Sequence, residues 1–374
     1  LITVGITGQS GFMGTHLYNF LGTKSEKIDR LNFQDSYFDN EVDLQNFVKS
    51  CDVIVHLAAM NRHEDEQVIY NTNIELVKKI INACEATNST PKIIFSSSTQ
   101  EEKDNLYGKS KRDGRKYFEA WAIKNSCRVL SLIIPNVFGP FGKPFYNSFI
   151  ATFSCQIIAG EQPTIINDST VNLTYINELS QVFYDKILDE GNEDINSYLV
   201  PHTSSRKVSE ILDLLKEFKI QYLENGQVPK VDLNSFELDL FNTFTSFIPK
   251  DYFPIKFTNH TDERGAFVEI MRAGSPGQTS YSTTIPGITR GNHYHTRKIE
   301  RFAVISGKAL IQIRKIDSDE VFEYILDGAE PAYVDMPIWY THNIKNIGNT
   351  ELITLFWINE PYNPEDADTY FVNV

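Results

Sequence analysis

The sequence lacks any apolar run long enough to cross a membrane. Its 374 residues are 41% hydrophobic and 22% charged, which is ordinary for a globular protein. No stretch approaches the roughly 18 to 20 consecutive apolar residues of a spanning helix. The chain begins at Leu1 and shows neither the basic segment nor the apolar core of a secretory leader. We therefore expect a cytoplasmic protein that does not insert into membranes, and its length predicts two domains.

Positive charge and cysteine are both scarce. The chain has 35 Lys and Arg against 49 Asp and Glu, a net charge of −14, and both parts are acidic when it is divided after Phe244. Nucleic acids attract basic surfaces, so we expect no nucleic-acid partner. The cysteines are only four and form no CxxC pair: Cys51, Cys84, Cys127 and Cys155. This spacing indicates reduced core thiols instead of a metal or redox motif.

The chain has two successive patterns. Up to about residue 190, continuous apolar runs such as 2–6 and 52–57 alternate with helical patterns. This predicts an α/β domain with a Rossmann-like, doubly wound parallel sheet covered on both faces. From about Tyr252, short β-like runs separated by Gly, Pro, Asn and Asp predict an all-β barrel or sandwich. The predicted domains are 1–245 and 246–374.

A glycine-rich turn follows the first predicted strand. Gly8, Gly11 and Gly14 flank Phe12 and Met13 in a G-x-x-G-x-x-G pattern. Such glycines allow a tight turn and close approach of a pyrophosphate, while the next helix directs its N-terminus at the anion. The position between a strand and a helix favours dinucleotide binding over an ordinary strand–helix turn.

The choice between NAD and NADP depends on the tip of the second strand. We expect this strand to end near Ile28, which places Asp29 and Arg30 at its tip. An acid there binds the ribose 2′-hydroxyl of NAD, and an arginine accommodates the 2′-phosphate of NADP. We favour NADP(H) because Arg30 is the only cation at that tip. The alternative is that both side chains are solvated surface charges.

A tyrosine and a lysine lie four residues apart after another strand end. Tyr107 and Lys111 share one face if the segment is helical. A lysine ammonium beside a phenol lowers the phenol pKa and lets it exchange a proton with a carbonyl or alcohol. A hydroxyl from Ser98 can bond the same oxygen, with Ser97 or Thr99 as alternatives.

These motifs, with Leu57-Ala58-Ala59 after a strand and the 136–140 segment, resemble extended short-chain dehydrogenases/reductases that act on nucleotide sugars. The resemblance covers about residues 1–245. It implies that Tyr107 donates a proton, that Lys111 binds the ribose and the tyrosine, and that Ser98 binds the carbonyl oxygen. The glycine turn and residues 57–59 would contact the cofactor.

The sequence departs from that family in two places. Only nine residues separate Ser98 from Tyr107, which is shorter than usual and leaves Ser97 or Thr99 open as the hydroxyl. The Asp-Glu pair of the dehydratases is replaced by Thr99-Gln100, with Glu101 following. We therefore expect a reductase.

The β-like half contains a possible metal shell. His293 and His295 point to the same face of a strand, and a hairpin return brings Glu300 beside them. His342 follows on a distant strand. Three imidazoles and one carboxylate suit Zn²⁺, or another divalent ion such as Mn, Fe or Ni. Each histidine alone is ordinary in a β-domain core, but the combined spacing favours a metal site.

These residues resemble the two motifs of the cupin superfamily, over about residues 252–374. The second motif departs from the pattern, because Trp339 stands where the family often has glycine, and we expect this to reshape the pocket mouth. The 262–269 segment is similar to the opening of sugar-nucleotide epimerases of that superfamily. Epimerisation beside a ketone needs an acid, a base and stabilisation of an enediolate, which a metal can provide. Acid–base candidates are Tyr294, Lys298, Tyr340 and His293. A purely structural metal is the alternative.

The order of the two halves resembles bifunctional enzymes of capsular polysaccharide synthesis. That resemblance implies a UDP-2-acetamido-2,6-dideoxy-4-hexulose as substrate, C3 epimerisation in the cupin half, and reduction at C4 with NADPH. The product would be UDP-2-acetamido-2,6-dideoxy-L-talose, the precursor of UDP-N-acetyl-L-fucosamine. It also implies a zinc ion and a homodimer. Alternatives are a non-catalytic binding or dimerisation module in the second half, a regulator that senses NADP, and a cupin dioxygenase fused to a reductase.

Overall fold

The structure, a computed structural model, describes residues 1–189, 191, 195–257, 259–262, 265–268, 272–273, 277–360 and 363–374. They form two compact units. The first contains residues 1–149 and 169–207, and the second contains residues 150–168 and 208–374. Within the described ranges, no helix combines the length and apolar character needed to traverse a bilayer.

The first unit is built on a six-stranded parallel sheet with strand order β2-β1-β3-β4-β5-β8. Its strands are β1 (Ile2–Thr7), β2 (Ile28–Leu31), β3 (Val53–His56), β4 (Lys92–Ser98), β5 (Val129–Ile134) and β8 (Ile195–Leu199). A smaller sheet joins β6 (Asn136–Phe138), β7 (Thr170–Tyr175) and β9 (Ser204–Lys207). The predicted parallel α/β architecture is confirmed.

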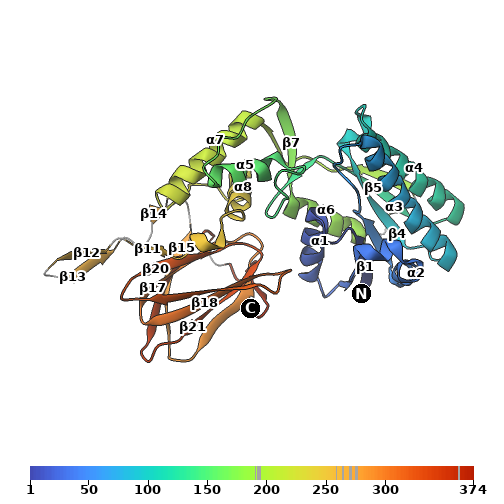
Figure 1. Ribbon diagram of the computed structural model, residues 1–374. Coiled ribbons are helices and arrows are strands. Elements are labelled where there is room, and N and C mark those ends of the chain that lie inside the picture. The colour runs from blue at the N-terminus through green and yellow to red at the C-terminus, as the bar shows by residue number, and fades with distance from the viewer. Residues whose placement is uncertain are drawn as a thin grey trace. The chain divides into compact units, whose positions relative to one another are not determined.

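Helices cover both faces of the six-stranded sheet (Figure 1). The helices α2 (Glu41–Ser50), α3 (Glu66–Thr87) and α4 (Leu106–Asn125) pack together on one face. On the other face α1 (Phe12–Gly22) packs on α6 (Ile176–Leu188). Strand residues such as Ile54 and Ile93 are fully buried because both faces are covered. The turns that follow the strands therefore meet at the carboxyl edge of the sheet, where ligands of such folds bind.

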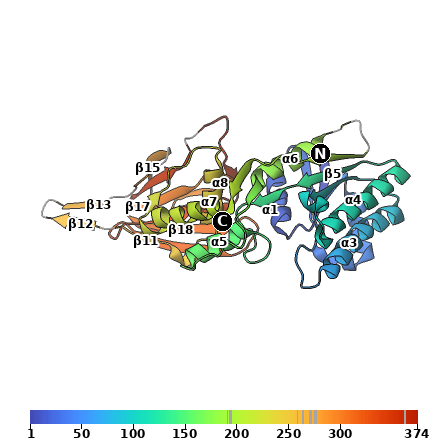
Figure 2. The same ribbon diagram turned by 90° about the horizontal axis from the view of Figure 1, so that it is seen from above.

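The second unit contains two five-stranded antiparallel sheets, visible in Figure 2. One sheet has the order β11 (Ile255–Lys256), β20 (Ala332–Met336), β17 (Glu300–Ser306), β22 (Leu352–Ile358) and β15 (Gln278–Thr284). The other has the order β19 (Val321–Asp327), β18 (Lys308–Lys315), β21 (Tyr340–Asn346), β16 (Thr289–Tyr294) and β23 (Tyr370–Phe371). Buried and exposed side chains alternate along β18, as expected for a strand with one buried face. The predicted antiparallel β half is confirmed.

Helical segments belong to the second unit as well. They are α5 (Phe149–Ile158), α7 (Val208–Phe218), the π-helix η3 (Lys219–Glu224), α8 (Phe236–Thr245) and η4 (Lys250–Tyr252). All of these except η4 lie within the predicted first domain, 1–245, so the compact units divide the chain differently from the predicted boundary. The remaining short strands are β10 (Gln227–Val228), β12 (Asn259–Asp262), β13 (Gly265–Val268) and β14 (Arg272–Ala273). In the epimerase-like 262–269 segment, residues 263, 264 and 269 lie outside the described residues.

A buried ion pair joins the β-sheet of the second unit to its helical layer. Arg301 donates from Nε and Nη2 to the Asp335 carboxylate at 2.7 and 2.9 Å. The Tyr222 hydroxyl, from η3, donates to the same carboxylate. Burial raises the pKa of Asp335 well above its ordinary value and lowers that of Arg301. Arg301 and Asp335 each need the other, and the Tyr222 hydroxyl, to offset the free-energy cost of removing their polar groups from water.

Candidate active sites

The glycine turn forms as the sequence predicts. Gly8 has φ +68°, in the left-handed region, and a Cβ there would lie 2.8 Å from the backbone of Ala58. A Cβ on Gly14 would overlap the Gly8 carbonyl oxygen, whereas one on Gly11 would lie 3.2 Å from it. Gly11 is the N-cap of α1 and makes no side-chain cap bond. The start of the helix therefore retains backbone donors for an anion, with Phe12 and Met13 in its first turn.

The second strand lies later in the chain than predicted. It starts at Ile28, where we expected it to end, and runs to Leu31. Arg30 is therefore inside the strand, and its Nη1 donates to the Tyr18 carbonyl of α1 at 2.8 Å. The strand tip is formed instead by Asn32, whose side-chain oxygen accepts a hydrogen bond from Gln9 at 2.9 Å. The argument for NADP from Arg30 at the tip is thus not supported, and binding of the cofactor by Arg30 stays a prediction.

The segment after β3 lies against the glycine turn. Leu57 donates its backbone N–H to the Thr7 carbonyl at 3.2 Å, and Ala58 donates to Thr7 Oγ1 at 3.4 Å. Thr7 also pairs with Nδ1 of His56 at 2.8 Å. Burial lowers the pKa of His56 to about 3, so this imidazole is neutral. The structure thus brings the predicted 57–59 segment next to Gly8.

Tyr107 and Lys111 share one face of α4, close to the end of β4. The Lys111 ammonium is 5.8 Å from the centroid of the Tyr107 ring and donates to the Ser96 carbonyl at 3.0 Å. Burial lowers the pKa of Lys111 to about 8. Burial, followed by the charge of Tyr146, raises the pKa of Tyr107 to about 12. The expected lowering of the phenol pKa is therefore not found, because desolvation of the buried phenol raises its pKa.

The three candidate hydroxyls at the end of β4 differ in their surroundings. Ser97 donates to the carboxylate of Glu101. Ser98 is buried and its oxygen accepts a bond from the Gln100 N–H at 3.1 Å, and within the described part of the chain its own O–H has no acceptor. Thr99 is exposed. Ser98 is thus the hydroxyl in this group with a buried position and an uncommitted proton.

Glu101 is not available as a free acid. Its carboxylate accepts bonds from Arg115 Nε and Nη2, the shortest at 2.7 Å, as well as the bond from Ser97. The carboxylate is only 9% exposed and thus acts as a structural anchor between η2 (Thr99–Glu102) and α4. This arrangement agrees with the expectation that the site lacks the acidic pair of a dehydratase.

Two residues of the first site were missed from the sequence. Asn73, buried on α3, donates to the Met60 carbonyl at 3.1 Å and to Ser110 Oγ at 3.0 Å, and accepts from the Met60 N–H at 2.7 Å. It thereby joins the loop after β3 to the helix of Tyr107. Asn105 caps this helix by accepting from the Gly108 N–H at 2.7 Å. Asn105 could have been predicted, because asparagine is a common N-cap residue at the start of a helix. No comparable sequence pattern predicts the contacts of Asn73.

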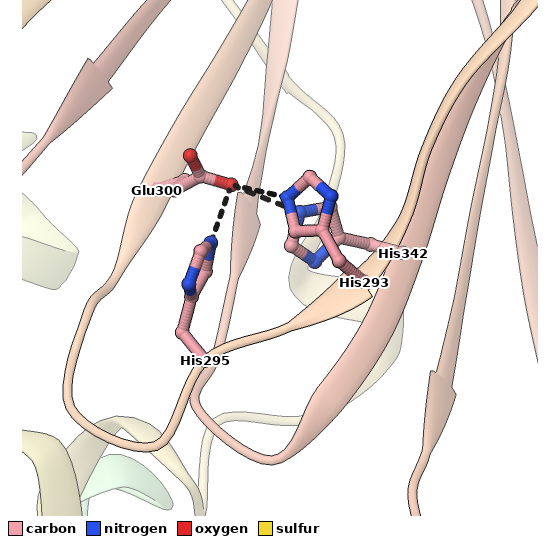
Figure 3. A group of neighbouring side chains, drawn as sticks. All are labelled: His293, His295, Glu300 and His342. Atoms are coloured by element: carbon pink, nitrogen blue, oxygen red, sulfur yellow. Dashed lines mark ion pairs between the residues drawn. The ribbon is translucent and has the colours of Figure 1, made fainter. Parts of the chain in front are cut away.

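The four predicted metal ligands come together in the second unit. His293 and His342 come from neighbouring strands of one sheet, Glu300 comes from the other sheet, and His295 follows the end of β16. Figure 3 shows the three imidazoles converging on one carboxylate oxygen. The Nε2 atoms of His342, His295 and His293 lie 2.9, 3.3 and 3.9 Å from Glu300 Oε2. Ligand atoms around a tetrahedral zinc with bonds of about 2.0–2.1 Å lie roughly 3.3 Å apart, so the residues fit such an ion.

Backbone carbonyls orient two of these imidazoles. His295 Nδ1 is 2.5 Å from the Asp368 carbonyl, and His342 Nδ1 is 3.2 Å from the Tyr340 carbonyl. Each Nδ1 therefore carries the proton, which directs the lone pair of Nε2 toward Glu300. Among the described residues, His295 Nε2, His342 Nε2 and Glu300 Oε2 are buried without a hydrogen-bond partner. Three buried acceptors facing one another need a cation or a shared proton between them.

The members of the cluster shift one another's pKa values, and the two buried histidines move in opposite directions. Burial alone would raise the pKa of Glu300, but the three histidines outweigh it and hold the pKa well below its ordinary value. Burial lowers the pKa of His342, whereas burial of His295 is outweighed by its contacts with Glu300 and Asp368, which raise the pKa of that imidazole. An ionised carboxylate and a neutral imidazole are the protonation states that a cation requires.

The acid–base candidates in the β half are not equivalent. Lys298 is buried and donates to the Ala367 carbonyl at 2.8 Å. The Tyr294 ring stacks between Trp339 and Tyr370, with centroids at 5.6 and 5.3 Å. Tyr340 lies two residues before His342 in β21, so its side chain leaves the strand on the same face.

Trp339 occupies a backbone conformation typical of glycine. Its φ is +61°, and its side chain is buried. Its N–H donates to the His295 carbonyl at 2.8 Å. The departure from the usual Pro-x-Gly motif therefore keeps the turn and fills the space beside it with an indole. A non-glycine residue in this region is strained by about 1–3 kcal/mol, which burial of the ring can offset.

Comparisons with known proteins agree with these two sites. Residues 4–194 match the family model of the NAD dependent epimerase/dehydratase family. The chain belongs to this family. Residues 260–370 match the polysaccharide biosynthesis C-terminal domain. The two matched segments lie inside the two predicted domains, while the boundary at residue 245 stays a prediction.

The resemblance to bifunctional capsular polysaccharide enzymes is confirmed over the full length of this family member. The crystal structure of capsular polysaccharide assembling protein CapF from Staphylococcus aureus covers 100% of both chains, with 33% identity and a TM-score of 0.62. A UDP-2-acetamido-2,6-beta-L-arabino-hexul-4-ose reductase from Pseudomonas aeruginosa is 33% identical over 374 residues, which are 99% of this chain and 98% of the relative. RMD from Pseudomonas aeruginosa, complexed with NADPH, is 20% identical over 58% of this chain and 84% of the RMD chain, and it shares the fold with a TM-score of 0.53.

Proposed function

We propose that this protein reduces the C4 ketone of a UDP-2-acetamido-2,6-dideoxy-hexulose with NADPH, after epimerising C3 in its β half. The product is UDP-2-acetamido-2,6-dideoxy-L-talose, the precursor of UDP-N-acetyl-L-fucosamine in capsular polysaccharide synthesis. The observation that carries the reductase is the joint position of Tyr107, Lys111 and Ser98 at the edge of a sheet that also carries the glycine turn. The full-length relatives named as a hexulose reductase and as CapF support the same substrate class.

In the first site, each side chain has a distinct task. Ser98 donates a hydrogen bond to the substrate carbonyl oxygen and keeps its proton, and Tyr107 transfers the one proton that this oxygen needs to become an alcohol. Lys111, held by the Ser96 carbonyl, stabilises the phenolate that Tyr107 becomes. Gly8, Gly11, Gly14 and residues 57–59 would hold NADPH, which would supply the hydride when bound.

In the second site, His293, His295, Glu300 and His342 would hold a zinc ion or a similar divalent cation. When bound, such an ion stabilises negative charge on a substrate oxygen beside the carbon that loses its proton. We assign the proton transfer to Tyr340, on the face of β21 that also carries His342; its ring contacts the Lys250 ammonium at 4.2 Å from the centroid. His293 is the most exposed of the four ligands, with 20% of its side chain accessible, and lies where the substrate would enter.

A second candidate keeps the reductase but makes the β half a binding or dimerisation module. The 2.9 Å approach of His342 to Glu300 is compatible with a purely structural cation, which gives this alternative its support. The protein would then be a homodimer held by a non-catalytic β half.

One experiment tests both assignments. Tyr107→Phe should lower NADPH oxidation on the keto-sugar by about 10³-fold, because the proton donor is lost. The same variant should still exchange the C3 hydrogen for solvent deuterium, followed by NMR. Reduction that persists in Tyr107→Phe contradicts the reductase site. Absence of C3 exchange in the wild-type protein, with reduction intact, favours the binding module.

A further inference from the structure

The loop from 139 to 146, which follows β6, is held in a strained shape. Phe141 has φ +66° and Phe145 has φ +57°, both in the left-handed region that non-glycine residues avoid. The Phe145 side chain is 62% exposed, so its conformation is not maintained to bury an apolar ring. Strain of this kind persists only where the surroundings enforce it, and it is concentrated at functional sites.

The first anchor of this loop comes from α1, the helix that opens at the glycine turn. His16 Nε2 pairs with the Pro140 carbonyl at 2.8 Å. The imidazole stacks on the Phe141 ring with centroids 5.8 Å apart, and the Phe12 ring meets its edge at 5.3 Å. The beginning of the loop is thus fixed to the helix that carries the dinucleotide turn.

The second anchor comes from the segment that follows residues 57–59. Arg62 Nη1 donates to the carbonyls of Phe145 and Tyr146, both at 3.0 Å. The same guanidinium nitrogen therefore bonds the carbonyl of the strained residue and the carbonyl of the residue that follows it. The Lys143 ammonium lies 5.0 Å from the centroid of the Tyr146 ring and adds a cation–π contact. Both anchors thus start from elements that we assign to the cofactor, and both act on the loop that presents Tyr146.

The residue that this clamp presents lies near the reacting phenol. Tyr146 is half-buried, whereas Phe145 before it faces solvent. Burial, and after it the proximity of the Tyr146 phenol, raise the pKa of Tyr107. A phenol at this position can donate a hydrogen bond to a sugar hydroxyl or acetamido oxygen beside the carbonyl that Tyr107 protonates.

We propose that Tyr146 is a further substrate-contacting residue of the reduction site, and that Arg62 is the positioning residue that holds it there. The ligand class is a pyranose ring with hydroxyl or amide oxygens next to the ketone. This inference rests on the proposed reductase function.

The test uses the full-length protein with NADPH and the keto-sugar. We expect Tyr146→Phe to lower kcat/KM for the sugar by about 5- to 20-fold, the effect of one lost hydrogen bond. The alkaline limb of its pH profile should move to lower pH, because Tyr107 loses the neighbour that raises its pKa. Arg62→Ala should raise KM for the sugar by about 10-fold with a smaller change in kcat, because the loop is positioned less often. Arg62→Lys, which keeps one cationic donor, should recover part of this loss.

Controls separate the possible failures. NADPH affinity, measured by its fluorescence, should be unchanged in all these variants. Arg128→Ala removes an exposed arginine before β5, at the opposite edge of the sheet, and should behave as wild type. If wild type reduces the sugar while Tyr146→Phe and Arg62→Ala match it in KM, kcat and pH profile, the inference is wrong and the reductase stands. If the wild-type protein reduces no 4-keto nucleotide sugar, both the proposed function and this inference are wrong.

Discussion

Three consecutive hydroxyls at the end of β4 show how far the surroundings decide the use of one chemical group. Ser97 is committed to Glu101, Thr99 is exposed, and Ser98 is buried with a free proton. A hydroxyl that stabilises a developing oxyanion must be able to donate, so Ser98 is the best placed of the three.

This difference predicts unequal effects of alanine substitution. Ser98→Ala should lower kcat for NADPH oxidation by about 10²-fold, the typical effect of losing one oxyanion donor. Ser97→Ala should retain most activity and lose stability instead, by roughly 1–3 kcal/mol, because Glu101 loses a buried partner. Steady-state kinetics and urea unfolding of both variants, with Thr99→Ala as the matched control, measure this. Equal kinetic losses in Ser97→Ala and Ser98→Ala would contradict the assignment.

At the scale of single residues, the separations of the residues in the sequence were enough to predict which side chains lie together in most of the candidate sites. Tyr107 and Lys111 share a helix face, and His293 and His295 meet Glu300, as their separations predict. Asn73 could not be found in this way, because its partners Met60 and Ser110 are joined to it only by the tertiary fold. The sequence also cannot show that burial raises the pKa of the Tyr107 phenol.

At the scale of elements, the turn between β1 and α1 leads us to expect unequal losses of NADPH binding when different glycines are substituted. Gly14→Ala should abolish measurable NADPH binding, since its Cβ would overlap the Gly8 carbonyl oxygen and the turn could not close. Gly11→Ala should weaken binding by less than about 10-fold, because its Cβ would lie 3.2 Å from the same oxygen and small shifts relieve the contact. NADPH fluorescence titration measures both, and circular dichroism checks that each variant is folded. Equal losses in the two variants would argue against a turn that closes on Gly8.

The segment before β23 leads to another prediction. The Asp368 carboxylate accepts the N–H groups of Thr296 at 3.1 Å and Arg297 at 3.0 Å, and its carbonyl orients His295. Asp368→Ala should free this loop and lower metal affinity by about 10- to 100-fold, as loss of an orienting group typically does. Chelator competition measures the affinity. Asp366→Ala is the control, because Asp366 pairs with Arg297 from an exposed position. Unchanged affinity in Asp368→Ala would show that the loop holds His295 without this anchor.

The placement of β2 shows where local pattern fails at this scale. No proline or further glycine follows Gly22 to mark the start of the strand, and the polar 23–27 segment resembles a continued loop. The strand begins at Ile28 because Ile28 pairs with Ile2, while Leu31 pairs with Gly5. This register depends on β1, which is remote in sequence, so the tip could not be located from the second strand alone.

At the scale of the whole molecule, the change in sequence texture near residue 245 locates a change of fold type. It does not locate the edge of a compact unit, because α7 and η3 are helical yet belong to the same unit as the antiparallel sheets. The helices of both units have similar apolar spacing, so composition cannot assign them to one sheet or the other. The position of the boundary affects stability, because the buried pair of Arg301 and Asp335 is bonded by Tyr222, which precedes residue 245.

Truncation tests this division. A fragment starting at residue 246 lacks Tyr222 and uncovers Arg301 and Asp335, whereas a fragment starting at 208 retains the cover. We expect the shorter fragment to be less stable by at least about 3 kcal/mol, because a buried ion pair is left without part of its surroundings. Thermal melting of the two fragments measures the difference. Equal stability would support residue 245 as the true domain boundary.

The hydrogen bond between His295 and the Asp368 carbonyl also determines when His295 can be oriented during translation. The two residues are 73 positions apart, so His295 leaves the ribosome long before its partner has been made. At about 5–20 residues per second, that interval lasts roughly 4–15 seconds. During it Glu300 and His342 are both produced, but the imidazole of His295 is not yet held in its ligating orientation. The proposed cation site would therefore be complete only after residue 368 has been translated.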